Sequence, residues 1–364
     1  MADKVLVTGA CGFVGPFIIE ELKRKGYEPV ATDLPGADYC RVEGLECEVR
    51  IADLLKRDEA KAVMKGVDIV VHTAARMNYY LARPEYELAN YHVTLNTCEA
   101  ALSSGVKRFV HFSTCDTYGP PDYSPVDENH PQRPINLYAI TKLLGEQAAI
   151  RYHRNHDLPL TIIRPTTVYG PGCVYVMGLF LALPVMLREL GVKSVMLPRK
   201  GFSGNLVHID DIAGAAVFAM EKDEALGEAY NVSDDTTLPF GALVGVILNS
   251  IGIETKLVLP FSNSIVAMAS RLGMHLPRIF FTRITDFLQE RWDRVVMDHC
   301  LVPALHPRFD PGFMSFGRGN YDFDNAKIKS LGYELRKPSF KEGWKEAVAW
   351  YMDNEWVPRY EAVR

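Results

Sequence analysis

Short apolar runs alternate with longer amphipathic stretches along the first 165 residues of the chain. The apolar runs are rich in Val, Ile and Phe and are bounded by Gly, Asp, Ser or Pro, which is typical of buried strands. The pattern predicts strands at 4–8, 28–32, 47–51, 68–72, 108–113 and 160–164, and helices at 13–25, 55–64, 84–103 and 137–156. Because strands that alternate with helices form parallel β-α-β units, we expect an α/β fold with a doubly wound parallel sheet.

The alternation ends after about residue 170, where Gly and Pro cluster. We expect a buried or pocket-lining helix at 176–187, a strand near 206–209, a helix at 212–221, and aromatic-rich helical stretches between 240 and 320. The chain therefore divides into a first domain at 1–170, with a returning segment near 205–235, and a smaller C-terminal lobe at 171–364.

The composition indicates a soluble protein that works in a reducing compartment. Among 364 residues, 48% are hydrophobic and 23% charged, and the net charge of −5 without a basic block argues against nucleic acid as a partner. Seven cysteines without a C-x-x-C pair predict neither zinc nor disulfides. The pair His153 and His156 fits a solvated helix face, so we expect no metal site.

No stretch of the sequence indicates a secretory signal or a membrane span. The chain starts Met-Ala-Asp-Lys and runs directly into a predicted strand, which leaves no room for a signal peptide. The most apolar run, 176–187, is shorter than the roughly 20 residues that a spanning helix needs. We therefore expect a cytoplasmic protein.

A glycine-rich turn joins the first strand to the first helix, in the stretch VLVTGACGFVG. Gly9, Gly12 and Gly15 allow a sharp turn and a close approach to the unpaired N–H groups of a helix start, which favours a dinucleotide pyrophosphate. Asp33 ends the second strand, where a carboxylate accepts hydrogen bonds from ribose hydroxyls and repels a 2′-phosphate. The pattern predicts a Rossmann-type domain that binds NAD rather than NADP.

Asp53 is a second acidic residue at the end of a predicted strand. It fits two roles equally well: a hydrogen bond to the adenine amino group, or a cap before the helix that follows. The sequence does not decide between them.

The candidate chemistry lies in the stretch YAITK, where Tyr138 and Lys142 are four residues apart on a predicted helix and share one face. A free tyrosine has a pKa of about 10. We expect the lysine ammonium and an oxidised nicotinamide to lower that pKa, so that the phenol can exchange a proton with a carbinol oxygen. Thr114 follows the fifth strand and can orient the same oxygen.

The glycine turn, the Ser/Thr strand end and the Y-x-x-x-K pair stand in the order typical of one family, and residues 3–240 resemble the extended short-chain dehydrogenase/reductase superfamily. The resemblance implies Thr114, Tyr138 and Lys142 as the catalytic set. It also implies a homodimer through the helices at 84–103 and 137–156. Further cofactor contacts that it implies are Cys11, Phe13, Val14, Leu54, Thr73, Ala74, Ala75, Asn90, Ser113, Pro165, Thr167 and Val168.

Two departures from the family concern the substrate. Members that act on nucleotide sugars usually carry Asn after the motif RP and Arg before the motif H-V-x-D, whereas this chain has Thr166 and Asn205 there; a displaced Arg199 would compensate. Dehydratases carry Thr-Asp-Glu after the fifth strand, whereas this chain has Thr-Cys115-Asp116. Cysteine cannot supply the acid, while Asp116 fits either the position of a catalytic glutamate or a loop cap. With Met77, the residues Thr166, Cys115 and Asp116 are the candidate substrate contacts.

The C-terminal half is rich in Leu, Phe, Met and Ile, which is similar to the 3β-hydroxysteroid and sterol dehydrogenase branch and also fits an ordinary core. The segment 255–315 is larger than a minimal lobe needs and fits a cover over an apolar substrate or a peripheral contact with a membrane. The resulting hypothesis is an NAD-dependent dehydrogenase of a hydrophobic, steroid-like or other polycyclic alcohol. The alternatives are a nucleotide-sugar epimerase or dehydratase with tightly bound NAD, and a non-catalytic dinucleotide sensor.

Overall fold

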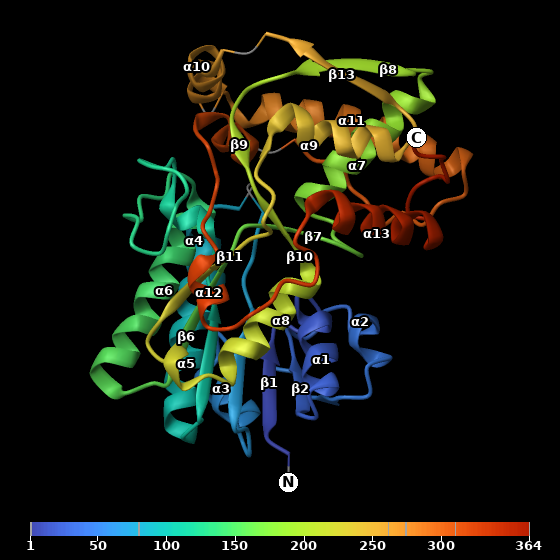
Figure 1. Ribbon diagram of the computed structural model, residues 1–364. Coiled ribbons are helices and arrows are strands. Elements are labelled where there is room, and N and C mark those ends of the chain that lie inside the picture. Colours follow the sequence, from blue (N-terminus) through green and yellow to red (C-terminus); the bar gives the residue numbers. More distant parts are fainter. Residues whose placement is uncertain (1, 79–80, 261, 274, 310, 364) are drawn as a thin grey trace.

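A computed structural model describes residues 2–78, 81–260, 262–273, 275–309 and 311–363 (Figure 1). Its centre is a seven-stranded sheet with the order β11-β6-β5-β4-β1-β2-β3, in which all neighbours are parallel. The strands are β1 Lys4–Thr8, β2 Glu28–Thr32, β3 Glu48–Val49, β4 Ile69–His72, β5 Arg108–Phe112, β6 Leu160–Pro165 and β11 Ala229–Val232. The expected doubly wound, Rossmann-type sheet is therefore confirmed.

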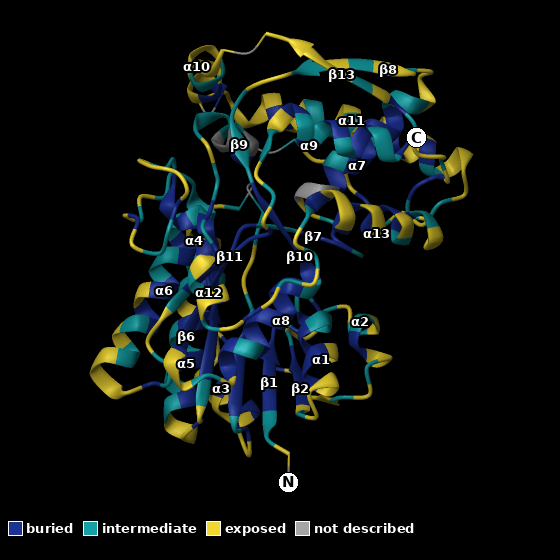
Figure 2. Ribbon diagram, viewed as in Figure 1, coloured by how far each residue is buried: buried dark blue, intermediate teal, exposed yellow. Residues whose placement is uncertain are grey.

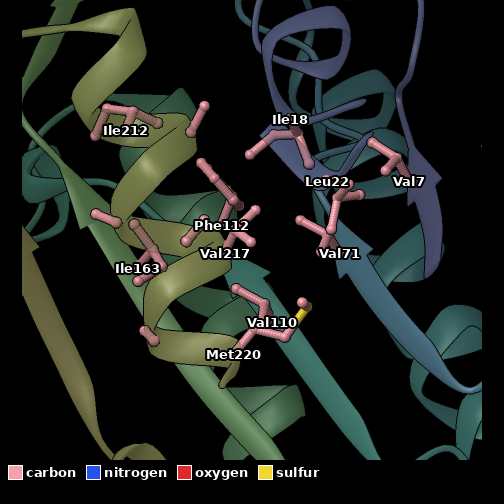
Figure 3. Packing of buried hydrophobic residues seen from close by; sticks show 14 of the residues in the cluster. Val7, Ile18, Leu22, Val71, Val110, Phe112, Ile163, Ile212, Val217 and Met220 are labelled. Atoms are coloured by element: carbon pink, nitrogen blue, oxygen red, sulfur yellow. The ribbon is translucent and has the colours of Figure 1, made fainter. Parts of the chain in front are cut away.

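Helices cover both faces of this sheet, which explains why its strands are continuous apolar runs. Helices α1 Gly15–Arg24 and α8 Ile209–Met220 pack on one face, where Ile18 and Leu22 meet Val71 and Val217 (Figure 3). The other face carries α3 Arg57–Val63, α5 Val93–Ser104 and α6 Leu137–His156. Figure 2 shows the strands as the most buried part of the molecule.

The prediction of one continuous helix at 84–103 is wrong. The structure divides this stretch into α4 Arg83–Tyr86, a π-helical segment η1 Glu87–His92, and α5. The irregular segment lies tightly against α6: a Cβ on Gly145 would lie 2.5 Å from the Asn90 carbonyl oxygen. Such local widening of a helix is common next to functional sites. Contacts with α6, which the sequence pattern does not report, accompany this change.

Helices α7 Val176–Glu189, α9 Phe240–Ser250, α11 Arg278–Asp298 and α13 Phe340–Asp353 pack around a second core that contains Trp292, Trp344 and Tyr351. With the elements next to them they form the second lobe. In contrast, α12 Ala326–Ser330 packs with the first core through Ile328. The other strands and helices of the chain are α2 Cys40–Glu43, η2 Cys115–Tyr118, β7 Thr167–Tyr169, β8 Ser194–Pro198, β9 Ser203–Gly204, β10 Leu206–His208, η3 Asp223–Ala225, β12 Leu238–Pro239, β13 Glu254–Leu259, α10 Asn263–Gly273 and η4 Pro311–Arg318. Among the described residues, no helix combines the length and apolar character required to cross a bilayer.

The division of the chain into the domains 1–170 and 171–364 stays a prediction. Helix α8 packs against α1, and strand β11 pairs with β6 in the central sheet. Both elements lie within the returning segment expected near 205–235.

Candidate active site

A cavity of about 620 Å³ opens at the carboxyl ends of the central strands. This is where the strand order reverses, between β1 and β4, and where doubly wound sheets bind their ligands. The predicted site residues that line it are Gly9, Cys11, Gly12, Phe13, Val14, Asp33, Asp53, Leu54, Thr73, Ala74, Ala75, Met77, Ser113, Thr114, Asp116, Tyr138, Lys142, Pro165, Thr166, Thr167 and Val168. The sequence reasoning missed Leu88, Val93 and Tyr175, which also line it and lie on or before predicted helices.

Three predicted residues do not line the cavity. Gly15 serves packing, because a Cβ there would lie 2.4 Å from the Ala10 carbonyl oxygen. Asn90 is buried behind the wall, where its Oδ1 accepts from Arg76 N at 2.8 Å and its Nδ2 donates to Thr141 Oγ1 at 3.1 Å. Cys115 points into the protein, and its Sγ donates to the Arg164 carbonyl at 3.1 Å. Burial raises the pKa of this thiol, so it is a packed, unreactive group.

The glycine turn brings the start of α1 to the cavity. Gly9 has a φ of +68°, and a Cβ there would lie 2.8 Å from Ala74 Cα, so only glycine fits between β1 and the turn after β4. A Cβ on Gly12 would lie 3.0 Å from the Gly9 carbonyl oxygen. Among the residues that the structure describes, no side chain caps the start of α1, which therefore presents N–H groups and its positive dipole end to the cavity. This cradle fits a pyrophosphate.

The two acidic residues at strand ends have backbone partners. Asp33 Oδ2 accepts from Cys11 N at 2.9 Å, and its Oδ1 accepts from Leu34 N at 2.8 Å, so the carboxylate is fixed at the cavity wall with acceptor capacity left over. Asp53 Oδ1 accepts from Leu55 N at 3.0 Å and caps the turn before α3. Asp53 also lines the cavity, so both of its predicted roles remain compatible with its position.

Tyr138, Lys142 and Thr114 converge at the carboxyl end of β5. Asn136 starts α6 by accepting from Ala139 N at 2.8 Å, which puts Tyr138 in the first turn and Lys142 one turn later. The Tyr138 phenol hydrogen-bonds Thr114, and the Lys142 ammonium donates to the Phe112 carbonyl oxygen. The structure therefore brings the three expected catalytic residues together.

Burial controls the electrostatics of this trio. Burial, assisted by Asp116, raises the pKa of the Tyr138 phenol, and Lys142 is not among the groups that act on it most strongly. Burial lowers the pKa of Lys142 to about 8, while Glu146 opposes this shift. In the protein alone, removal from water therefore outweighs the neighbouring charges. The expected lowering of the tyrosine pKa by the lysine ammonium together with an oxidised nicotinamide stays a prediction. At neutral pH the chain holds a protonated phenol beside a lysine that titrates near 8.

Asp116 faces the same cavity, next to Tyr138. Burial raises the pKa of its carboxyl group to about 6, so it changes charge close to neutral pH. A cavity carboxyl group with such a pKa can accept or donate a proton.

The sequence reasoning missed a buried ion pair next to the three catalytic candidates, formed by Arg164 and Glu146. Arg164 on β6 donates to both carboxylate oxygens of Glu146 on α6, from Nη2 to Oε1 at 2.6 Å and from Nε to Oε2 at 3.1 Å. Arg164 also donates to the Tyr118 hydroxyl at 2.7 Å. Glu146 lies one turn after Lys142, so the pair locks α6 to the sheet at the catalytic turn. The sequence did offer a signal for this pair, because Arg164 lies in a predicted strand and the oppositely charged Glu146 lies in the predicted helix before it.

The positions expected to anchor a sugar diphosphate are used differently. Asn205 is buried and exchanges two hydrogen bonds with the backbone of Phe323. Arg199 is exposed and does not line the cavity. Thr166 does line it, and its buried hydroxyl has no hydrogen-bond partner within the part of the chain that the structure describes. That hydroxyl and the glycine cradle are the groups that a bound dinucleotide or substrate would satisfy, so the site fits NAD.

Comparison with known proteins gives one family. The model of the NAD dependent epimerase/dehydratase family matches residues 5–233. The dTDP-D-glucose 4,6-dehydratase of Mus musculus is 25% identical over 374 residues, with 97% of this chain and 90% of that protein covered. The sterol-4-alpha-carboxylate 3-dehydrogenase, decarboxylating, of Bos taurus is 27% identical over 265 residues, with 70% and 71% covered.

Solved structures agree on the fold. The dTDP-glucose 4,6-dehydratase DesIV of Streptomyces venezuelae, solved with NAD and TYD bound, superposes with a TM-score of 0.68 at 22% identity and covers 98% of this chain and 99% of its own. With a glycine turn and a tyrosine-lysine pair in one cavity, the chain is an oxidoreductase of the NAD-dependent epimerase/dehydratase family, within the extended short-chain dehydrogenase/reductase superfamily.

Proposed function

We propose that the protein is an NAD-dependent dehydrogenase that interconverts a secondary alcohol and a ketone on a hydrophobic, steroid-like or other polycyclic or lipid substrate. The observation that carries the proposal is the convergence of Thr114, Tyr138 and Lys142 on the cavity that also contains the glycine turn. The three groups can bind one oxygen atom, and the turn can hold a dinucleotide beside it.

The glycine turn would hold the pyrophosphate of NAD, and Asp33 would bind the adenosine ribose. The Asp33 carboxylate is fixed by two backbone N–H groups and cannot move away from an added 2′-phosphate, which supports NAD over NADP. When bound, the nicotinamide supplies the hydride acceptor or donor. In this arrangement Lys142 binds the nicotinamide ribose.

Tyr138 moves the proton, and Thr114 positions the substrate oxygen. In the reductive direction the phenol donates its proton to the ketone oxygen, and its raised pKa keeps that proton in place at neutral pH. In the oxidative direction the phenolate removes the hydroxyl proton, and the positive charges of Lys142 and the oxidised nicotinamide favour the phenolate. Thr114, which hydrogen-bonds Tyr138, orients the same oxygen.

The substrate class rests on the cavity walls. Met77, Leu88, Val93 and Tyr175 contribute apolar surface, as pockets for hydrophobic ligands require. Asn205, which stands where a sugar diphosphate would meet an arginine, is bound to Phe323 instead, and Arg199, which would compensate, lies on the outer surface.

Asp116 favours a second candidate, a nucleotide-sugar epimerase or dehydratase that keeps NAD bound. Its carboxyl group titrates near 6 inside the cavity, as a proton-transfer group in such a cycle would. The likeness to the mouse and Streptomyces dehydratases supports this second candidate. The evidence against it is Cys115, which stands at the position of the acid that a dehydratase needs and points away from the cavity.

One assay separates the candidates. The protein is incubated with NAD and either sterols and other polycyclic alcohols or UDP- and dTDP-sugars, and released NADH is followed by absorbance, with thermal shift as a second readout of ligand class. We expect NADH in step with ketone formation from a hydrophobic alcohol, and the matched variant Asp116→Asn should retain this oxidation. Conversion of a nucleotide sugar without released NADH, abolished by Asp116→Asn, would establish the second candidate instead. The absence of any turnover with preserved NAD binding would favour the non-catalytic sensor.

A further inference from the structure

Helix α10 of the second lobe has its large apolar side chains in water. Ile265, Met268 and Leu272 follow the spacing of one helix face and are 63%, 58% and 65% exposed. The opposite side carries the packing: Ser270 and Gly273 are buried against η4. A helix of a globular lobe normally buries its apolar face, so this exposed face is a candidate contact surface.

The exposed apolar surface continues onto neighbouring elements. Met196 on β8 and Val258 on β13 are both 61% exposed, and Ile279 near the start of α11 is 59% exposed. Strands β8 and β13 pair with each other, and with α10 they lie at the end of the molecule farthest from the N-terminus (Figures 1 and 2). We call the surface formed by β8, β13, α10 and the start of α11 the lobe edge.

Apart from Glu254 at the first position of β13, every charged side chain in the segments that form the lobe edge is positive. Between Glu254 and Asp286 the sequence has no acidic residue but has Lys256, Arg271, Arg278 and Arg283. Between Glu189 and Asp210 it again has no acidic residue but has Lys193, Arg199 and Lys200. The chain as a whole carries a net charge of −5, so the lobe edge departs from the average charge of the protein.

Basic residues lie beside apolar ones at two places on the lobe edge. All seven are exposed, and Arg199 N donates to the Leu259 carbonyl at 3.3 Å, which joins the basic loop after β8 to the end of β13, just before α10. On α10, Arg271 is next to Leu272. Apolar side chains that enter the acyl boundary, with Lys and Arg at headgroup level, are the features of a helix that lies in the plane of a membrane.

We propose that the lobe edge docks the protein peripherally onto an anionic lipid surface, with Ile265, Met268 and Leu272 inserted and the basic side chains paired with headgroups. A second copy of the chain is a poorer occupant, because self-association would bring two sets of uncompensated positive charges together. The proposal does not depend on the substrate assignment, because binding to lipid is measured without turnover.

The test is co-sedimentation of the full chain with phosphatidylcholine vesicles, with and without phosphatidylglycerol, at low and high ionic strength. We expect binding that requires the anionic lipid and weakens with salt, since each basic residue near the surface contributes about 1 kcal/mol. The variants Met268→Ser/Leu272→Ser and Arg271→Glu/Arg278→Glu should each lower the partition coefficient at least about tenfold.

The matched control is Lys65→Glu/Arg154→Glu, which makes the same charge change at exposed sites of the first domain. It should bind vesicles like the wild type, and all variants should retain NADH binding and the thermal midpoint, which excludes misfolding. Failure of the wild type to bind anionic vesicles would overturn the proposal. An equal loss of vesicle binding in the control variant would also overturn it. So would dimerisation that depends on protein concentration, occurs without lipid and is abolished in Met268→Ser/Leu272→Ser.

Discussion

Replacement of Glu146 by Gln tests the buried ion pair under the catalytic turn. Glu146 is fully buried and Arg164 is 5% exposed, and the two share hydrogen bonds of 2.6 and 3.1 Å. The variant leaves the guanidinium without its counter-charge, which costs about 3–5 kcal/mol when one partner of a buried pair is removed. We expect this loss in the apparent free energy of unfolding, measured by urea denaturation. A double variant, Glu146→Leu/Arg164→Met, should recover most of it, because it removes both charges.

The same variant should change the pH dependence of turnover. Burial lowers the pKa of Lys142 to about 8 although Glu146 acts in the opposite direction, so the loss of the carboxylate lowers that pKa further. Turnover that needs the Lys142 ammonium falls as the pH rises through this pKa, and in Glu146→Gln the fall should start at a lower pH. Unfolding within about 1 kcal/mol of wild type, together with an unchanged alkaline limit, would refute the role given to the pair.

Three further predictions follow from the cavity. Gly9→Ala strains a backbone with φ +68° and drives a Cβ to within 2.8 Å of Ala74 Cα, so calorimetric NAD affinity should fall by at least about tenfold; an unchanged affinity would show that the turn does not hold the dinucleotide. Asp33→Ser should raise affinity for NADP relative to NAD in the same titration, and a preserved preference would remove Asp33 from the ribose site. Asp116 has its pKa raised from 3.8 to about 6, so the folded state binds more protons and the wild type loses stability as the pH rises from about 4 to 6. Asp116→Asn should abolish that loss and be about 3 kcal/mol more stable near neutral pH in urea denaturation, and identical pH profiles would contradict the shift.

The first half of the fold was predictable because its strands and helices are local patterns. The bounds of β1, β2 and α6 match the expectation, since each is a buried apolar run or a helix with a side-chain cap at its start. The break of 84–103 into α4, η1 and α5 was not predictable, because it accompanies the contact between Asn90 and Gly145, which are 55 residues apart.

The candidate site was predictable in its motifs but not in its orientations. The glycine turn and the Tyr138-Lys142 spacing are local, and the structure brings them to one cavity. Cys115 and Asp116 are neighbours in sequence, yet one faces the interior and the other faces the cavity, which depends on the η2 turn. The raised pKa of Tyr138 depends on burial by several elements, and no spacing rule conveys it.

The central claim is that Tyr138 transfers the proton that accompanies hydride transfer. The most direct test is the single-turnover rate of NADH formation in Tyr138→Phe, with saturating NAD and an alcohol that the wild type oxidises. We predict a loss of at least about 10²–10⁴-fold in that rate, with unchanged NAD affinity, because the variant keeps the ring and its packing but lacks the hydroxyl. A rate equal to that of the wild type would contradict the account.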